Sequence, residues 1–347
     1  MVEPRRLAVR TAAARMSEMA GDSVGRSVGY SVRGERRVGP GTRIEVVTEG
    51  LFLRRIQLDP TLEGVSAVLL DEFHERSLAV DLALALTLDV RSALRPDLRL
   101  LVMSATIDPE PVAAVLGHGG DPAAVVAATA PLFPVETRYR PGSAHDRLED
   151  RVTTVVREAL RDDTGDVLVF LPGRGEIRRT RTILDPLEAT AVPGGVVELA
   201  ELHGSLSPDE QLHVVRSPEP GRRRVILSTS LAETSITVPG VRVVVDAGRR
   251  RTQRVDPDTG LPALLTGPVS RAGADQRRGR AGRLGPGVAY RLWSENDDRH
   301  RPADETPEML DGDLTALVRQ PHAWGVDDPG ETGWLDVPPP IAVRSAK

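Results

Sequence analysis

The 347-residue chain contains no cysteine, which excludes a disulfide framework and a thiolate metal site. It has no apolar run long enough to span a membrane and no signal-peptide start, so we expect a soluble, cytoplasmic protein without a membrane partner. Aromatic residues make up only 3% of the chain, which leaves little surface for stacking on nucleobases. Lys347 is the only lysine, and arginine therefore carries almost all of the positive charge.

The segment 67–76 joins a short apolar run to a cluster of charged residues. Residues 67–70 are predicted to form a buried parallel strand, and Asp71, Glu72 and His74 follow where that strand ends. In open parallel α/β sheets, ligands bind outside the carboxyl ends of the strands, so two carboxylates there could hold a cation and polarise a water. The tetrapeptide by itself is more often a solvated turn after a core strand.

Strands and helices alternate along the chain, which predicts an α/β protein with two tandem parallel-sheet units. The helix that opens after residue 48 has Thr48 as its expected N-cap. The other predicted helices cover 11–20, 78–94 and a stretch that ends near 187. The predicted strands are 28–32, 43–47, 67–70, 98–103, 166–171, 196–202, 224–227, 241–245 and 288–293.

Changes in composition suggest where the domains begin and end. We expect a first domain over 1–137, a linker over 138–150 and a second domain over 151–293. Proline, aspartate and glycine in 254–261 predict a hairpin turn. Residues 294–347, with a short helical stretch at 310–318, are expected to start a further, helical or winged-helix region. The first domain is expected to be incomplete, because the chain opens directly on the end of a strand.

An arginine-rich cluster covers residues 276–283. Gln276, Arg280 and Arg283 are four and three residues apart, so on a helix they share one face, as arginine fingers aimed at a phosphoryl group would. The alternative is a flexible basic loop that touches phosphates non-specifically. Arg277 and Arg278 fall on other faces, which favours the first interpretation.

Taken together, four motifs resemble those of superfamily 2 helicases of the DEAH/RHA group. They are Asp71-Glu72-Phe73-His74, Ser104-Ala105-Thr106, Thr229 with 233–235, and 276–283, in that order and spacing. Phe73, the continuation to Ser77 and the ending at 317–328 are similar to the HrpB-type ATP-dependent helicases of bacteria. The resemblance covers essentially the full chain. It implies two RecA-like domains that hold ATP between them and single-stranded nucleic acid, RNA in preference to DNA, across their top.

The resemblance also implies roles for individual residues. Asp71 would hold Mg²⁺ through water and Glu72 would orient the attacking water, while His74 and Gln276 would link this site to the second domain. Arg280 and Arg283 resemble fingers that neutralise charge on the γ-phosphate. Ser104 and Thr106 resemble the motif that couples hydrolysis to strand movement. Arg15 would pack on the nucleobase of ATP, and the residues expected to grip the nucleic-acid backbone are Arg5, Arg6, Thr48, Gly50, Arg54 and Thr229.

One family motif does not occur in these 347 residues: the G-x-x-x-x-G-K-[ST] loop that family members carry ahead of the strand at Pro4-Arg5-Arg6. A wrong start codon, a gene fragment and a true loss would each explain this. We therefore keep three hypotheses: a piece of an ATP-dependent helicase that is inactive alone, a catalytically dead nucleic-acid-binding or assembly protein, and a different P-loop enzyme such as a GTPase. The third is disfavoured because no base-recognition motif is found.

Overall fold

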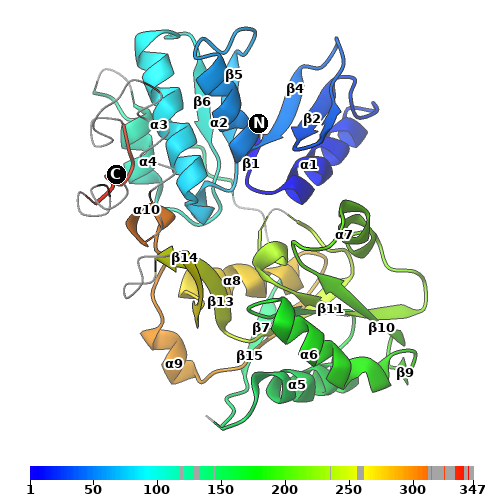
Figure 1. Cartoon of the computed structure of the whole chain (residues 1–347). Helices are drawn as coiled ribbons and strands as arrows, with labels where there is room; N and C mark the ends of the chain where they lie inside the picture. The colour runs from blue at the N-terminus through cyan, green and yellow to red at the C-terminus, as the bar shows by residue number, and fades with distance from the viewer. Residues whose placement is uncertain are drawn as a thin grey trace. The chain divides into compact units, whose positions relative to one another are not determined.

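The computed structural model describes residues 1–117, 120–128, 133–143, 145–234, 236–255, 262–311 and 333–339, together with Leu314, Trp324 and Val343. The chain divides into two compact units, drawn in Figure 1. Unit 1 comprises Met1–Ala128, Gln253–Ala263 and Thr306–Lys347, and unit 2 comprises Thr129–Thr252 and Leu264–Glu305.

The described strands of unit 1 form one sheet in the order β3-β2-β4-β1-β5-β6. Every neighbouring pair is parallel except β2 with β3, which confirms the predicted parallel sheet. The short first strand therefore lies inside the sheet, between β4 and β5. The bounds are β1 Val2–Glu3, β2 Val28–Val32, β3 Glu35–Arg37, β4 Ile44–Thr48, β5 Ala67–Leu70 and β6 Arg99–Val102.

The helices of unit 1 are α1 Arg6–Met19, α2 Glu49–Leu58, α3 Leu78–Ala93 and α4 Pro109–Leu116. Helix α1 packs on β2 and β4, and α2 packs on α3. Helix α3 starts at the N-cap Ser77, whose side chain accepts a hydrogen bond from the Val80 amide at 3.0 Å. Most of its residues over the first three turns are buried, as expected for a helix that is apolar on all sides.

Residues near the carboxyl terminus join the core of unit 1. Met309, in α10 Glu308–Asp311, is buried there with Leu314, Trp334 and Val343. The sequence had suggested that 294–347 start a further region. Apolar residues scattered among prolines do not indicate which core they enter, so the packing of these residues in unit 1 could not be predicted. Most of the predicted helix at 310–318 and of the ending at 317–328 lies outside the described residues.

Unit 2 is built on a second sheet, in the order β7-β15-β12-β8-β11-β10-β9. All its described pairs are parallel except β9 with β10. The strands are β7 Val135–Tyr139, β8 Asp166–Phe170, β9 Ala191–Val192, β10 Gly195–Leu202, β11 Arg222–Ser228, β12 Val241–Asp246 and β15 Gly287–Arg291. The helices are α5 Leu148–Asp162, α6 Arg174–Leu184, α7 Pro208–Val214, α8 Arg271–Gly279 and α9 Glu295–His300.

The boundary between the predicted domains has to be moved. Strand β7 pairs with β15, so residues 135–137 belong to unit 2 and not to the first domain, and α5 begins inside the predicted linker. Pro134 and Pro141 bracket β7. Proline is tolerated beside an edge strand, so these prolines flank a strand of unit 2 and do not mark a linker.

Strands β13 Arg249–Val255 and β14 Pro262–Pro268 form a two-stranded sheet, which confirms the predicted hairpin pairing. The turn residues 256–261 lie outside the described residues.

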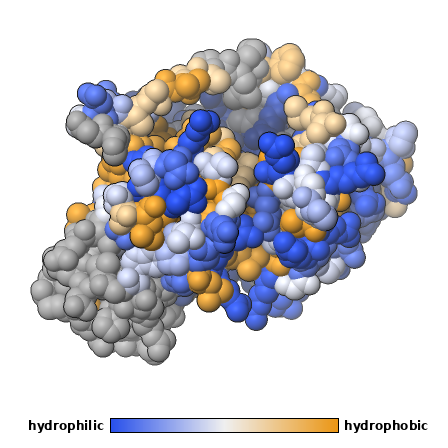
Figure 2. All heavy atoms as spheres, turned by 90° about the horizontal axis from the view of Figure 1, so that it is seen from above, coloured by the Kyte–Doolittle hydropathy of each residue, from blue (hydrophilic) through white to orange (hydrophobic). Residues whose placement is uncertain are grey.

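The face of the molecule drawn in Figure 2 mixes hydrophilic residues with small apolar patches. Exposed apolar side chains include Leu101, which is 51% exposed on the edge strand β6. Among the described helices, none has both the length and the apolar character needed to cross a membrane.

Candidate functional site

The acidic loop of unit 1 has an unusual backbone. Asp71 directly follows β5, and its amide donates to the Val2 carbonyl at 3.0 Å. Glu72 and Arg76 adopt left-handed conformations, with φ of 50° and 47°, on either side of the 3-10 turn Phe73–Glu75. Such conformations are strained for residues other than glycine and concentrate at functional sites.

Glu3 is a member of this site that the sequence analysis did not single out. It ends β1, beside β5, and is only 3% exposed. Burial and the neighbouring Asp71 carboxylate raise the pKa of Glu3 to about 9. Burial also raises the pKa of Asp71, while the hydrogen bond from Glu3 opposes that rise. At neutral pH, Glu3 is therefore the protonated partner and donates its proton to the Asp71 carboxylate. The order of the strands, which brings the two together, is not visible in sequence.

His74 connects the acidic loop to the segment that follows β6. Its Nδ1 atom accepts from the Ala105 amide at 3.4 Å, and its Nε2 atom lies 3.4 Å from Glu72 Oε2. An accepting Nδ1 places the proton of a neutral imidazole on Nε2, toward Glu72. The Nε2–Glu72 contact is not aligned well enough to be a hydrogen bond. The structure thus brings His74 together with the predicted 104–106 motif, in which Ser104 Oγ accepts from the Ile107 amide at 3.3 Å.

Ion pairs hold the far end of the loop. Arg76 donates to Asp81 Oδ1 at 2.9 Å and to Asp336 at 2.6 Å, and its carbonyl accepts from the Glu308 amide at 3.1 Å. Arg5 pairs with Glu75 at 3.1 Å. Contacts from both ends of unit 1 therefore stabilise the strained loop.

Most of the residues predicted to grip nucleic acid in unit 1 lie at one edge of its sheet. Arg5 and Arg6 follow β1, Thr48 is the last residue of the neighbouring strand β4, and Gly50 lies two residues beyond it. Because parallel strands end on the same side, these residues share that side with Asp71. Arg6, Gly50 and Arg54 are exposed. Thr48 occupies the N-cap position of α2, as predicted, although its side chain makes no capping hydrogen bond to the described residues.

Arg15 is not brought to this edge. It lies nine residues beyond Arg6 on α1, or roughly 14 Å along the helix axis at 1.5 Å per residue. Its guanidinium is exposed and pairs with Glu18 at 2.7 Å.

The arginine motif of unit 2 differs from the predicted helix face. Helix α8 ends at Gly279, and Arg280–Gly282 form a 3-10 turn. The 3.6-residue period therefore does not extend from Gln276 to Arg283, and the three side chains do not share one α-helical face. Arg280 is buried and donates to the carbonyls of Glu233 and Ile236.

Arg283 is exposed, and it donates to the Thr237 hydroxyl. Gln276 is half-buried on α8. Thr229 follows β11, and its hydroxyl accepts from the Leu231 amide at 3.4 Å. Ser235 lies outside the described residues.

Arg277 stabilises unit 2 from within. Its fully buried guanidinium contacts Glu233 Oε2 at 2.9 Å and Asp246 Oδ1 at 2.8 Å, and it lies 5.0 Å from the centre of the Phe170 ring. The two carboxylates raise its pKa further above the ordinary arginine value, although burial acts in the opposite direction. This ion network links the ends of β8 and β12 to the segment that Arg280 also binds.

Comparison with known proteins places these motifs in a family. The helicase conserved C-terminal domain matches residues 150–285. The ATP-dependent RNA helicase HrpB of Escherichia coli (strain K12) is 46% identical over 347 residues, a match that covers 100% of this chain and 42% of that protein. The mouse probable ATP-dependent RNA helicase DHX34 (Mus musculus) is 37% identical over 355 residues, covering 99% of this chain and 30% of that protein. The crystal structure of the Escherichia coli DEAH/RHA helicase HrpB superposes with a TM-score of 0.90 at 45% identity, covering 99% of this chain and 43% of that one.

The two parallel α/β sheets, with acidic and arginine motifs after their strands, are those of RecA-like helicase units. Within this class the chain is similar to the HrpB-like group of DEAH/RHA helicases. It spans less than half the length of the HrpB proteins that it matches.

Proposed function

We propose that this chain is part of an ATP-dependent RNA helicase of the HrpB type, which couples ATP hydrolysis to movement along a single strand in the cytoplasm. The observation that carries the proposal is the strained acidic loop after β5. It presents Asp71 and Glu72 together, and its His74 contacts the segment after β6. Through His74, a change in the position of Glu72 when a nucleotide binds would shift the segment after β6.

The acidic residues suit a nucleotide-bound Mg²⁺. Mg²⁺ in phosphoryl-transfer sites is held by one or two carboxylates together with substrate phosphates. The described residues contain no cluster of three or more metal-ligating side chains, so the ion would need oxygens from the nucleotide. Asp71 would hold the ion through water. Glu72 would orient the attacking water, and the protonated Glu3 would keep the Asp71 carboxylate in place.

In unit 2, we propose that Arg280 and Arg283 neutralise charge on the γ-phosphate and that Gln276 contributes to the same site. In this role Arg280 would exchange a hydrogen bond to the carbonyl of Glu233 or Ile236 for one to a phosphate oxygen. The same segment continues from Thr229, which we propose binds the nucleic-acid backbone. An exchange of hydrogen-bond partners at Arg280 would thus connect the nucleotide to the strand.

A catalytically dead nucleic-acid-binding protein remains the second candidate. It is favoured by the lack of any G-x-x-x-x-G-K-[ST] sequence in residues 1–347. Residues 1–347 by themselves therefore lack the loop that positions the phosphates, and phosphoryl transfer depends almost wholly on positioning and preorganised charge.

The test compares two proteins. Residues 1–347 alone should release no phosphate from ATP above background, with or without single-stranded RNA. A chimera that places a family phosphate-loop segment ahead of Met1 should hydrolyse ATP faster when RNA is added. Glu72→Gln in the chimera should abolish turnover and leave RNA affinity within a few-fold, whereas Glu63→Gln, at an exposed acid before β5, should change neither. A chimera that binds RNA but never hydrolyses ATP would establish the second candidate.

A further inference from the structure

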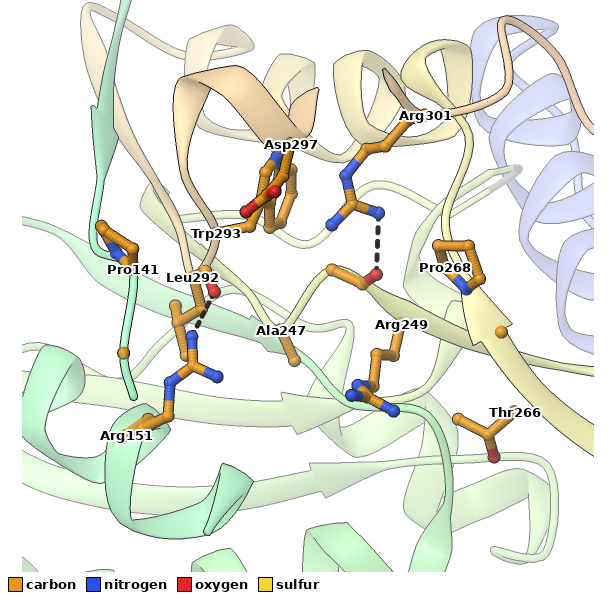
Figure 3. Close-up of a pocket in the computed structure, with 13 residues that line it drawn as sticks. Pro141, Arg151, Ala247, Arg249, Thr266, Pro268, Leu292, Trp293, Asp297 and Arg301 are labelled. Atoms are coloured by element: carbon orange, nitrogen blue, oxygen red, sulfur yellow. Dashed lines mark hydrogen bonds between the residues drawn. The ribbon is translucent and has the colours of Figure 1, made fainter. Parts of the chain in front are cut away.

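Unit 2 contains a cavity of about 330 Å³ at the carboxyl ends of β7, β15 and β12. Figure 3 shows arginines from three separate segments around it. Arg151 comes from α5, Arg249 from the start of β13, and Arg301 from the residue after α9. None of these residues has a role in the helicase motifs described above.

Two of the arginines are fixed in place. Arg151 donates to the Leu292 carbonyl, and Arg301 donates to the carbonyls of Gly248 and Val269, each at 2.9 Å. The Arg301 guanidinium also lies 4.0 Å from the centre of the Trp293 ring. A guanidinium has five N–H donors. Hydrogen bonds to described residues use two N–H donors of Arg301 and one N–H donor of Arg151. The other N–H groups of both guanidinium groups can therefore donate to a ligand.

Two glycines make room for these guanidinium groups. A Cβ atom on Gly142 would lie 2.1 Å from Arg151 Nε, and one on Gly248 would lie 2.6 Å from Arg301 Nη2. Gly248 also has a φ of 71°, which glycine adopts without strain. The bare backbone at both positions is therefore necessary for the shape of the cavity.

The cavity carries an excess of positive charge. Asp297 is the acidic residue in its lining, and one of its oxygens accepts from the Ser294 amide at 3.2 Å in the cap of α9. Arg249 is exposed, and although its carbonyl accepts from Arg277, its guanidinium makes no hydrogen bond to the described residues. The lining thus has three guanidinium groups and one carboxylate, and that carboxylate already accepts a hydrogen bond from Ser294. This excess of positive charge favours binding of an anion with several oxygen acceptors.

We propose that this pocket binds a phosphate group carried on a sugar. The volume exceeds what a bare phosphate needs, and the polar lining gives no free aromatic face for a base, because Arg301 covers Trp293. The phosphate could belong to a single strand or to a free nucleotide.

A single strand is the source that the fold favours, and this step rests on the proposed function. In the sheet, only β8 separates β12 from β11, whose carboxyl end carries Thr229. At about 4.8 Å between strands, this spacing is about 10 Å. All three strands are parallel, so a nucleic acid bound at Thr229 can continue to the pocket on the same side of the sheet.

The test uses the full chain and Arg249→Ala, because the Arg249 side chain makes no hydrogen bond or ion pair to the described residues and the substitution keeps the backbone carbonyl that Arg277 binds. Binding of inorganic phosphate is followed by the change in tryptophan fluorescence that Trp293→Phe removes, since Trp324 and Trp334 also emit. Binding of a labelled single-stranded oligouridine is followed by anisotropy. Arg299→Ala is the matched control, since Arg299 lies on α9, is exposed and pairs only with Glu295 at 3.1 Å among the described residues. We expect Arg249→Ala to weaken both ligands about tenfold and Arg299→Ala to weaken each by less than twofold.

The possible outcomes separate the two proposals. Weaker phosphate binding with unchanged oligouridine binding would keep the phosphate pocket and exclude the strand as its source. A Trp293 signal that does not respond to phosphate, or responds equally in Arg249→Ala, would overturn the pocket. Oligouridine that binds no variant would count against the proposed function, while the phosphate titration would still decide the pocket.

Discussion

The buried Glu3 predicts an unusual dependence of stability on pH. In the folded chain its pKa is raised to about 9 from an ordinary value of 4.5, mainly by burial. Between these two pH values, the folded state keeps a proton that the unfolded state releases. Unfolding then releases a proton, so this residue makes the free energy of unfolding fall as pH rises, by up to about 1.4 kcal/mol per pH unit.

Replacing Glu3 by glutamine removes this effect and keeps the hydrogen bond. The glutamine amide can donate to the Asp71 carboxylate as the protonated carboxyl does, and it does not titrate. From pH 4.5 to pH 7 the accumulated difference is about 3 kcal/mol. We expect Glu3→Gln to be more stable than the parent at pH 7 by about this amount, relative to their difference at pH 4.5.

The assay is urea unfolding of unit 1 at several pH values between 4.5 and 8.5. Trp324 and Trp334 belong to unit 1, so tryptophan fluorescence in a Trp293→Phe background reports that unit alone. Glu49→Gln is the matched control. Burial raises the pKa of Glu49 to about 7, so its contribution in the same direction ends near that pH.

The two variants should therefore differ above pH 7. There the stability of the Glu49→Gln variant should keep falling as the parent does, while that of Glu3→Gln should lose this slope. Equal slopes for Glu3→Gln and the parent between pH 7 and 8.5 would refute the assignment of the shared proton to Glu3.

Three further predictions concern unit 2 and nucleic-acid binding. Arg277→Ala should destabilise unit 2 by about 3–5 kcal/mol in urea unfolding, because it leaves Glu233 and Asp246 buried without their cation; a loss below 1 kcal/mol would contradict this. In the chimera, Arg280→Ala should lower ATP turnover by orders of magnitude and leave single-strand affinity within a few-fold; the reverse pattern would assign Arg280 to strand binding. Affinity for single strands should fall steeply between low and physiological salt with little dependence on base sequence, and a flat titration would exclude backbone contacts as its basis.

Local patterns in the sequence predict most of the elements correctly. Buried strands such as β8 and β12 contain short apolar runs, at 167–170 and 243–245, and the helix at 78–93 follows from its apolar spacing. The sequence also predicted the acidic motif after β5 and the β13–β14 hairpin. The charged residues of the motif and the turn-forming residues of the hairpin are each close together along the chain.

Other features depend on which strands lie side by side. The pairing of β7 with β15 joins residues about 150 apart, and no local pattern distinguishes an edge strand between prolines from a linker. The prediction that Gln276, Arg280 and Arg283 share one helix face is wrong, because the α-helix ends at Gly279. Arg280 makes its buried hydrogen bond from the 3-10 turn that follows.

The sequence by itself determined the α/β class, the helicase motifs and their order, because each is a pattern of neighbouring residues. Only the tertiary structure decided that Glu3 shares a proton with Asp71, that Arg277 is buried between two carboxylates, and that Arg151, Arg249 and Arg301 surround one cavity. These groups are far apart along the chain. Burial, which sets their charge and their partners, is a property of the packed sheet.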